Sequence, residues 1–162
     1  MIVVADSSAL IALAAAGHLD VLPQLFEAVQ VPDAVRQEVD VPGQPYTGEL
    51  RRFLQDRVTP VDIRLVVLLD PSLGPGEMQA MALARQMQAD VLLIDDLRAR
   101  RVATANGFQV LGSLGALLLG KHRGLLSEIA PAILRMNQAG IRLAPALVDH
   151  VLRRAGESSL PH

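Results

Sequence analysis

The sequence contains no cysteine and no tryptophan, and its aromatic residues are three phenylalanines and one tyrosine. Without cysteine the chain cannot form a disulfide, a zinc finger or a thiol nucleophile. Because no disulfide framework calls for an oxidising compartment, we expect a cytoplasmic protein. An aromatic content of 2% also excludes RNA-binding modules that stack bases on paired rings.

An excess of charge of one sign is also lacking. Fifteen basic and 17 acidic side chains leave a net charge of −2, which argues against a polybasic nucleic-acid binder. Apolar residues make up 51% of the chain, so intrinsic disorder is excluded. A chain of 162 residues can bury one self-sufficient core. We therefore expect a single domain over residues 1–156, followed by a frayed tail at 157–162.

Neither of the two longest apolar stretches has the features of a membrane segment. Residues 1–16 have no basic start and carry Asp6 and Ser7 at their centre, which a signal peptide tolerates poorly. Residues 110–120 are too few for the roughly 20 that cross a bilayer, and they include three glycines. We expect a soluble protein that makes no membrane contact.

Short apolar runs alternate with segments of helical character. The runs predict strands at residues 2–5, 29–31, 91–94 and 108–111, with further candidates at 58–61 and 64–69. Helices are expected at 9–16, 19–28, 34–40, 49–57, 77–88, 97–105, 114–122, 126–139 and 145–155. Strands alternating with helices indicate right-handed βαβ units. The predicted fold class is therefore α/β, a three-layer α/β/α sandwich with a central parallel sheet.

Acidic residues stand where the predicted strands end. Asp6 directly follows the first strand, and Asp95 and Asp96 directly follow the third. Glu77 opens a helix after a glycine-rich loop, and Glu38 lies on the helix that follows the second strand. The carboxyl ends of parallel strands meet at one edge of a sheet, where ligands bind. We expect all five acids at that edge.

Carboxylates crowded together raise one another's pKa and destabilise the fold unless a cation is bound. No basic residue lies directly next to Asp6, Glu38 or Glu77 in the sequence. Hard divalent cations with oxygen ligands, Mg²⁺ or Mn²⁺, fit such a cluster. The implied chemistry is metal-assisted hydrolysis of a phosphodiester bond.

Each acid also has a plain structural alternative. Asp6 can cap the first helix, and Asp95 or Asp96 can cap the helix that follows them. Glu77 can complement a helix dipole, and Glu38 can be a solvated helix residue. The specificity of the pattern lies in its order along the chain: Asp, Glu, Glu, Asp-Asp.

Four segments of the sequence resemble the motifs of PIN-domain nucleases. Val3-Val4-Ala5-Asp6-Ser7-Ser8-Ala9-Leu10-Ile11 is similar to their opening, and Val31-Pro32-Asp33-Ala34-Val35-Arg36-Gln37-Glu38-Val39 to their second acidic motif. Leu73-Gly74-Pro75-Gly76-Glu77, followed by Ala80 and Ala84, resembles the third, and Leu92-Leu93-Ile94-Asp95-Asp96-Leu97-Arg98-Ala99-Arg100 the fourth, in the form of a prokaryotic subgroup. The similarity continues through residues 112–115 and 140–156, so it covers nearly the whole chain.

The resemblance implies a PIN-like fold and an endoribonuclease that depends on Mg²⁺ or Mn²⁺. Such proteins are often the toxin of a VapBC-type toxin–antitoxin pair and often form homodimers, so the implied partners are RNA, a cognate antitoxin and a second copy of the chain. By position, Asp6, Glu38, Glu77 and Asp96 would bind the metal, with Asp95 as an alternative or additional ligand. Ser7 would contribute a hydroxyl that supports a ligand.

The sequence departs from the family pattern at two positions. Glu77 stands where many toxin members have aspartate, and Ile94 stands where many have threonine or serine. The loss of that hydroxyl motivates a rival hypothesis, a catalytically weak PIN-like module that binds RNA or a protein partner. Arg98 and Arg101 share a helix face near the acids and are candidates to hold RNA phosphates. Their alternatives are a solvated face or ion pairs with the same acids.

Overall fold

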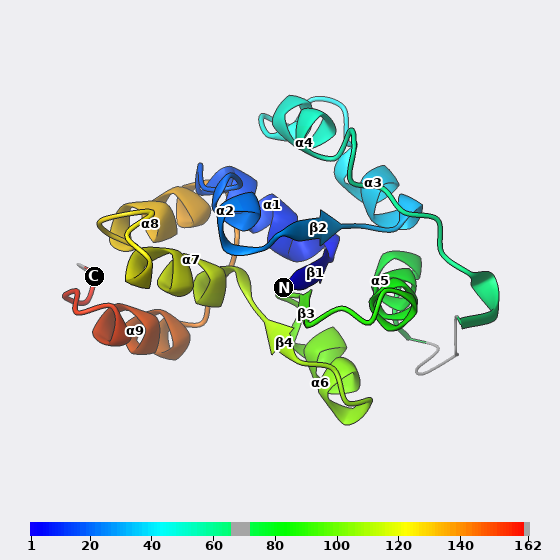
Figure 1. Cartoon of the computed structure of the whole chain (residues 1–162). Helices are drawn as coiled ribbons and strands as arrows, with labels where there is room; N and C mark the ends of the chain where they lie inside the picture. The colour runs from blue at the N-terminus through cyan, green and yellow to red at the C-terminus, as the bar shows by residue number, and fades with distance from the viewer. Residues whose placement is uncertain (66–71, 161–162) are drawn as a thin grey trace.

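A parallel sheet forms the centre of the molecule (Figure 1). The computed structural model describes residues 1–65 and 72–160, without the side chain of Ile63. In this part of the chain the strand order is β2-β1-β3-β4, and every pair is parallel. The strands are β1 (Ile2–Ala5), β2 (Ala28–Gln30), β3 (Val91–Leu93) and β4 (Val110–Leu111). The predicted parallel sheet is confirmed.

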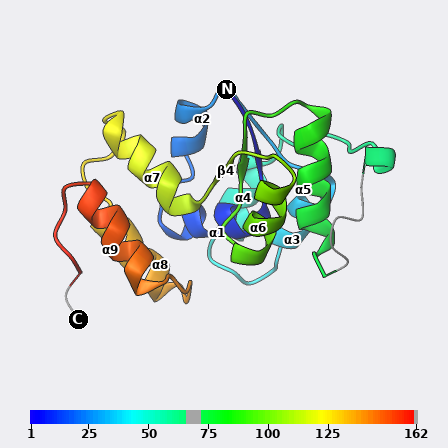
Figure 2. The ribbon, with the colours of Figure 1, turned by 90° about the horizontal axis from the view of Figure 1, so that it is seen from below.

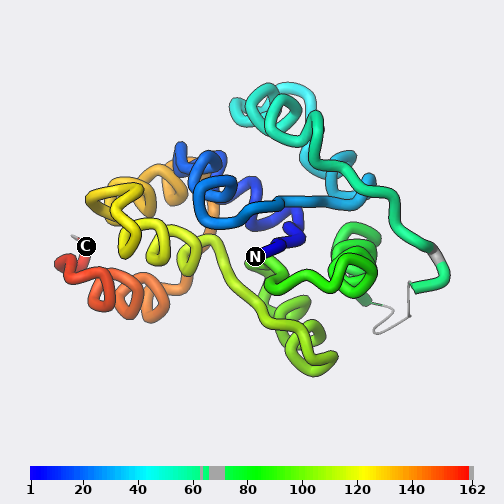
Figure 3. The backbone as a smooth tube through the Cα atoms, viewed as in Figure 1, coloured from blue at the N-terminus to red at the C-terminus, as the bar shows by residue number. Residues whose placement is uncertain are grey.

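Helices connect the strands and follow the last of them, as the tube in Figure 3 traces. They are α1 (Ser7–Ala15), α2 (Val21–Leu25), α3 (Asp33–Val39), α4 (Thr47–Phe53), α5 (Pro75–Gln86), α6 (Leu97–Ala105), α7 (Ser113–His122), α8 (Ala130–Gln138) and α9 (Pro145–Arg154), with a 3₁₀ turn at Ile63–Leu65. The helices α7, α8 and α9 gather at one end of the molecule, and α3 and α5 lie at the other (Figures 1 and 2).

Alternation along β1 separates the core into two layers. Val3 and Ala5 belong to the larger buried cluster, with α1 and α7, whereas Val4 belongs to a second cluster with α5 and α6. Successive side chains of a strand point to opposite faces of its sheet. Helices therefore cover both faces, and the predicted three-layer α/β/α sandwich is confirmed.

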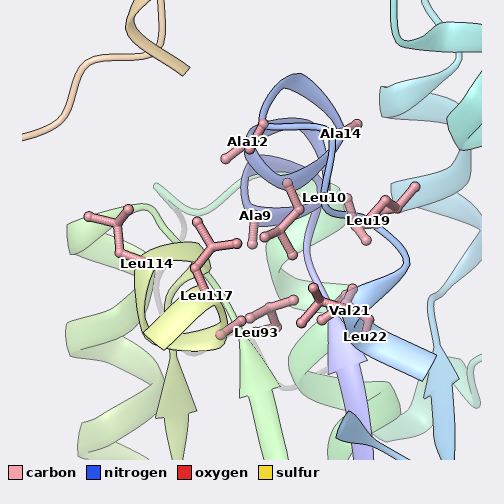
Figure 4. Close-up of a cluster of buried hydrophobic side chains, with 14 of the residues drawn as sticks. Ala9, Leu10, Ala12, Ala14, Leu19, Val21, Leu22, Leu93, Leu114 and Leu117 are labelled. Atoms are coloured by element: carbon pink, nitrogen blue, oxygen red, sulfur yellow. The ribbon is translucent and has the colours of Figure 1, made fainter. Parts of the chain in front are cut away.

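The larger cluster is built mainly from leucine and alanine. In Figure 4, Leu10 from α1, Leu117 from α7 and Leu93 from β3 point into one shared interior. All three side chains are fully buried. Each such side chain contributes roughly 1.5–3 kcal/mol by leaving water. This packing fixes α1, and therefore the residues that precede it, against the carboxyl end of the sheet.

Two predicted elements differ from the structure in ways that have clear causes. The helix expected at 19–28 ends at Leu25, because Phe26 adopts an extended backbone and Ala28 already begins β2. The strand expected at 58–61 is reduced to a single parallel bridge between Val31 and Val58. Pro60 has no N–H to continue that ladder.

Two further expectations concern the ends of described segments. The candidate strand at 64–69 begins in a 3₁₀ turn, and its residues 66–69 lie outside the described part of the chain. Fraying was expected from residue 157, yet Glu157 is anchored by hydrogen bonds and Leu160 packs on the core. Residues 161–162 lie outside the described part. No helix among the described residues is long and apolar enough to cross a membrane.

Candidate metal site at the carboxyl edge of the sheet

Asp6 lies at the end of β1 and is the most buried of the predicted site residues, with 1% of its surface exposed. It precedes α1, but its side chain makes no capping hydrogen bond. Its Oδ2 accepts a hydrogen bond from the Ser8 hydroxyl at 3.1 Å. Its Oδ1 is buried and has no hydrogen-bond partner among the described residues. The capping alternative for Asp6 is therefore wrong, and the orphaned oxygen requires another explanation.

The electrostatic surroundings of Asp6 are unfavourable to a bare carboxylate. Burial raises the pKa of Asp6 to about 6, although the Ser7 backbone and the Ser8 hydroxyl oppose that shift. The charges of Glu77 and Glu38 raise the pKa further. These three acids come from different parts of the sequence and act on one another here because the fold brings α3 and α5 to the end of β1.

Glu38 projects from α3 and makes two hydrogen bonds to neighbouring elements. Its Oε2 accepts from the Ser7 hydroxyl at 2.7 Å, and its Oε1 accepts from the Gly76 backbone N–H at 2.9 Å. Glu38 thus links α3 to the first turns of α1 and α5. The alternative of a merely solvated helix residue is wrong, even though the side chain remains exposed to solvent.

Glu77 lies in the first turn of α5. Its Oε2 accepts a hydrogen bond from the Gly74 N–H at 2.9 Å. The structural alternative therefore holds in part, because one carboxylate oxygen satisfies a free N–H at the helix start. The second oxygen makes no hydrogen bond recorded among the described residues, and the charge of Glu77 acts on Asp6.

Asp95 and Asp96 are adjacent in the sequence but have different surroundings. Asp95 accepts hydrogen bonds from the Ser113 N–H and the Ser113 hydroxyl, both at 2.6 Å, one on each carboxylate oxygen. Asp96 is exposed and caps α6, with Oδ1 accepting from the Ala99 N–H at 2.9 Å. Asp95 therefore holds the start of α7, whereas Asp96 keeps one oxygen outside its cap.

The carboxylate oxygens of this edge are the type of ligand that binds a divalent cation, but in this structure the side chains do not converge around one point. No three acidic or histidine side chains among residues 1–65 and 72–160 converge closely enough to hold a metal ion. The orphaned oxygen of Asp6 and the mutual repulsion of three carboxylates are nevertheless the features that a bound cation offsets. Glu38 and Glu77 are instead held by N–H and hydroxyl donors of the chain itself.

The arginines on α6 differ in their exposure to solvent. The Arg98 and Arg101 side chains are exposed, as a phosphate contact requires. Arg100 is partly buried and donates to the carbonyl oxygen of Ile94 at 3.0 Å, so it belongs to the framework. Ile94 itself is fully buried in the smaller core cluster.

Three residues that matter at this edge were not predicted. Ser8 connects Asp6 to the backbone of Asp95, Ser113 engages Asp95, and Gly76 accommodates Glu38. Serine and glycine are common at helix starts, so neither residue type is informative by itself. Ser8 and Gly76 lie within the acidic motifs, whereas Ser113 lies in the segment 112–115, where the family similarity continues without an acid.

Gly76 offers a direct test of the Glu38 position. A Cβ atom at Gly76 would overlap the carboxylate of Glu38, so Gly76→Ala will displace that carboxylate. If Glu38 is a ligand of a divalent cation, the affinity for Mn²⁺, measured by calorimetry, will fall by about tenfold or more. The free energy of unfolding will change little, because alanine favours a helix and the displaced group is the tip of a flexible side chain.

Gly48→Ala is the matched control, since Gly48 is also the second residue of a helix. A Cβ there meets only the Arg52 side chain, at an ordinary 3.5 Å. Unchanged Mn²⁺ affinity in Gly76→Ala would show that the position of Glu38 does not matter to the metal.

Comparisons with known proteins identify one family. A family described as a PIN domain matches residues 2–157 of the chain. No curated protein and no solved structure matches the chain.

Proposed function

The chain belongs to the PIN-domain family, and on that premise we propose that it is a divalent-metal-dependent endoribonuclease that hydrolyses RNA phosphodiester bonds. PIN domains are in general nucleases, and the family match confirms the resemblance seen in the motifs. The observation that carries the proposal is the buried Asp6, with an unpartnered oxygen, under the charges of Glu38 and Glu77.

We assign Asp6, Glu38, Glu77 and Asp96 to the binding of Mg²⁺ or Mn²⁺. Asp95 is the less suitable fourth ligand, because both of its oxygens already accept hydrogen bonds from Ser113. The assignment requires Glu38 and Glu77 to turn an oxygen toward Asp6, which side chains at the protein surface can do. A divalent ion supplies Lewis-acid stabilisation of the phosphate oxygens and activates water for attack on phosphorus.

The side chains of the protein perform the remaining tasks. Ser7 and the Gly76 N–H orient Glu38 through their hydrogen bonds. Arg98 and Arg101 lie on α6, the helix that begins beside Asp96, where guanidinium groups can hold RNA phosphates on either side of the scissile bond. Ser7 and Gly76 orient a metal ligand, so loss of their contacts should affect turnover. Arg98 and Arg101 balance the charge of the RNA phosphates, so their loss should affect the binding of RNA.

The partner assignments follow from the family and rest on the same proposal. We propose that the chain acts as the toxin of a toxin–antitoxin pair, with a cognate antitoxin protein and a second copy of itself as partners. Copurification of the product of a neighbouring small gene, together with the mass of the complex in solution, tests both assignments.

Metal removal tests the proposed activity itself. Purified protein should cleave end-labelled RNA with Mg²⁺ or Mn²⁺, lose the activity in EDTA and regain it when the metal is restored. DNA of the same sequence serves as the comparison substrate. Cleavage that persists in EDTA would contradict metal dependence. Absence of both Mn²⁺ binding and cleavage would favour the rival, a PIN-like module that binds RNA or a protein without cutting.

A further inference from the structure

The Ser8 hydroxyl lies between the ends of the two central strands. Its Oγ donates to Asp6 Oδ2 at 3.1 Å and accepts from the backbone N–H of Asp95 at 3.2 Å. Asp6 follows β1 and Asp95 follows β3, and these strands pair directly. Ser8 therefore connects the acidic segments of two different motifs through one side chain.

Among the described residues, Ser8 is the side chain that donates a hydrogen bond to the Asp6 carboxylate, and the Ser7 backbone also acts on that carboxylate. The Ser8 hydroxyl limits the orientation of this carboxylate, because rotation about the Cβ–Cγ bond breaks the contact. With Oδ2 held by Ser8, the orientation of the buried Oδ1 is defined as well. The neighbouring Ser7 does the same for Glu38, so consecutive hydroxyls orient two different acids.

The sheet does not need Ser8 in order to keep its register. The Asp6 N–H donates to the Leu93 carbonyl at 2.9 Å, and β1 and β3 pair through three residues each. Ser8 occupies the second position of α1, where alanine is equally compatible with a helix. The contribution of the hydroxyl is thus directed at the Asp6 carboxylate rather than at the fold.

We infer that Ser8 is a positioning residue of the nuclease site, which ties the Asp6 carboxylate to the Asp95 backbone and presents Oδ1 to the metal and substrate. This inference rests on the proposed function and extends it to a residue outside the acidic set. Ser8 touches neither substrate nor metal in this role. It acts through Asp6, so its removal should affect turnover and metal affinity but not the binding of RNA.

The test compares Ser8→Ala and Ser8→Thr with the wild-type protein. For Ser8→Ala we expect kcat for RNA cleavage to fall by about 10–100-fold and Mn²⁺ affinity to fall by about tenfold, as the loss of a ligand's supporting partner usually causes. KM for RNA should stay within about twofold, since the phosphate contacts are intact. Ser8→Thr keeps a hydroxyl on the same carbon and should restore most of kcat.

Thr59→Val is the matched control, because it also removes a partly buried hydroxyl hydrogen bond, but one whose acceptor is Gln30 Oε1, at 2.6 Å, and not an acidic side chain. Its kcat and Mn²⁺ affinity should equal those of the wild type. The inference is overturned if Ser8→Ala retains full kcat and Mn²⁺ affinity, if Ser8→Thr is as defective as Ser8→Ala, or if only KM changes. A wild-type protein that neither binds Mn²⁺ nor cuts RNA overturns the proposed function, and this inference with it.

Discussion

Asp6→Asn will reduce metal-dependent RNA cleavage by more than the roughly 10–100-fold that the loss of a supporting partner costs. Asparagine keeps the size and one oxygen of the side chain, but it removes the negative charge at the most buried position of the acidic edge. Calorimetry should show that Mn²⁺ binding is lost as well. A variant that cuts RNA at the wild-type rate would contradict the assignment of Asp6.

The same substitution will stabilise the metal-free protein. Burial raises the folded-state pKa of Asp6 from 3.8 to about 6, so the unfolded chain releases this proton first as the pH rises. The wild type therefore loses stability between about pH 4 and pH 6, by on the order of 3 kcal/mol in the limit, and the loss persists at higher pH. Asparagine does not titrate, so the variant avoids this loss of stability.

Denaturant unfolding in EDTA at pH 4, 6 and 8 measures this effect. The difference between Asp6→Asn and the wild type should be small at pH 4 and full at pH 8. Adding Mn²⁺ at pH 8 should raise the stability of the wild type and leave the variant unchanged. A variant that is less stable than the wild type at pH 8 in EDTA would show that Asp6 contributes to the fold rather than straining it.

Glu157→Gln will destabilise the fold. The Glu157 carboxylate accepts hydrogen bonds from the Lys121 ammonium at 2.8 Å and from the N–H groups of Ile129 and Ala130, at 2.8 and 3.0 Å for the nearest oxygen of each. These donors lie on α7 and at the start of α8, and Glu157 itself follows α9. One carboxylate thus joins the three helices at this end of the molecule.

We expect Glu157→Gln to lower the free energy of unfolding by about 2–4 kcal/mol, because it leaves a largely buried ammonium without its counter-charge. Lys121 and Glu157 are only 21% and 11% exposed. Thermal unfolding should show a drop of roughly 5–15 °C. Glu128→Gln is the matched control, since Glu128 is exposed at the same end of the molecule, and it should change little.

The effect of Glu157→Gln depends on pH in a defined direction. Burial alone would raise the pKa of Glu157, but Lys121 and the two backbone N–H groups outweigh it and hold the pKa below its usual 4.5. The carboxylate therefore stabilises the protein above pH 4.5, and this contribution is lost as the pH falls through the lowered pKa. The difference between variant and wild type should narrow in acid. A constant difference would show that the charge is not responsible.

Much of the fold followed from local patterns. The continuous apolar run at β1 predicted a strand covered on both faces, and the alternation of Val3, Val4 and Ala5 between two clusters confirmed it. The helix at residues 97–105 was predicted with its observed bounds. Elements whose ends depend on distant partners were predicted less well: β2 begins where its Ala28 pairs with Ile2, and no local pattern marks that residue.

At the acidic edge, residue chemistry and chain order were enough to pick out five carboxylates as candidates and to raise the hypothesis of a metal-dependent hydrolase. They were not enough to distinguish Asp95 from Asp96, or to find Ser8, because the direction of a carboxylate depends on the donors around it. The donors to Asp95 come from Ser113, 18 positions along the chain. The bond that orients Asp6 comes from a helix start that also contacts the Asp95 N–H, just after β3. The type and order of side chains are properties of the sequence, whereas their orientation arises only when separate segments pack together.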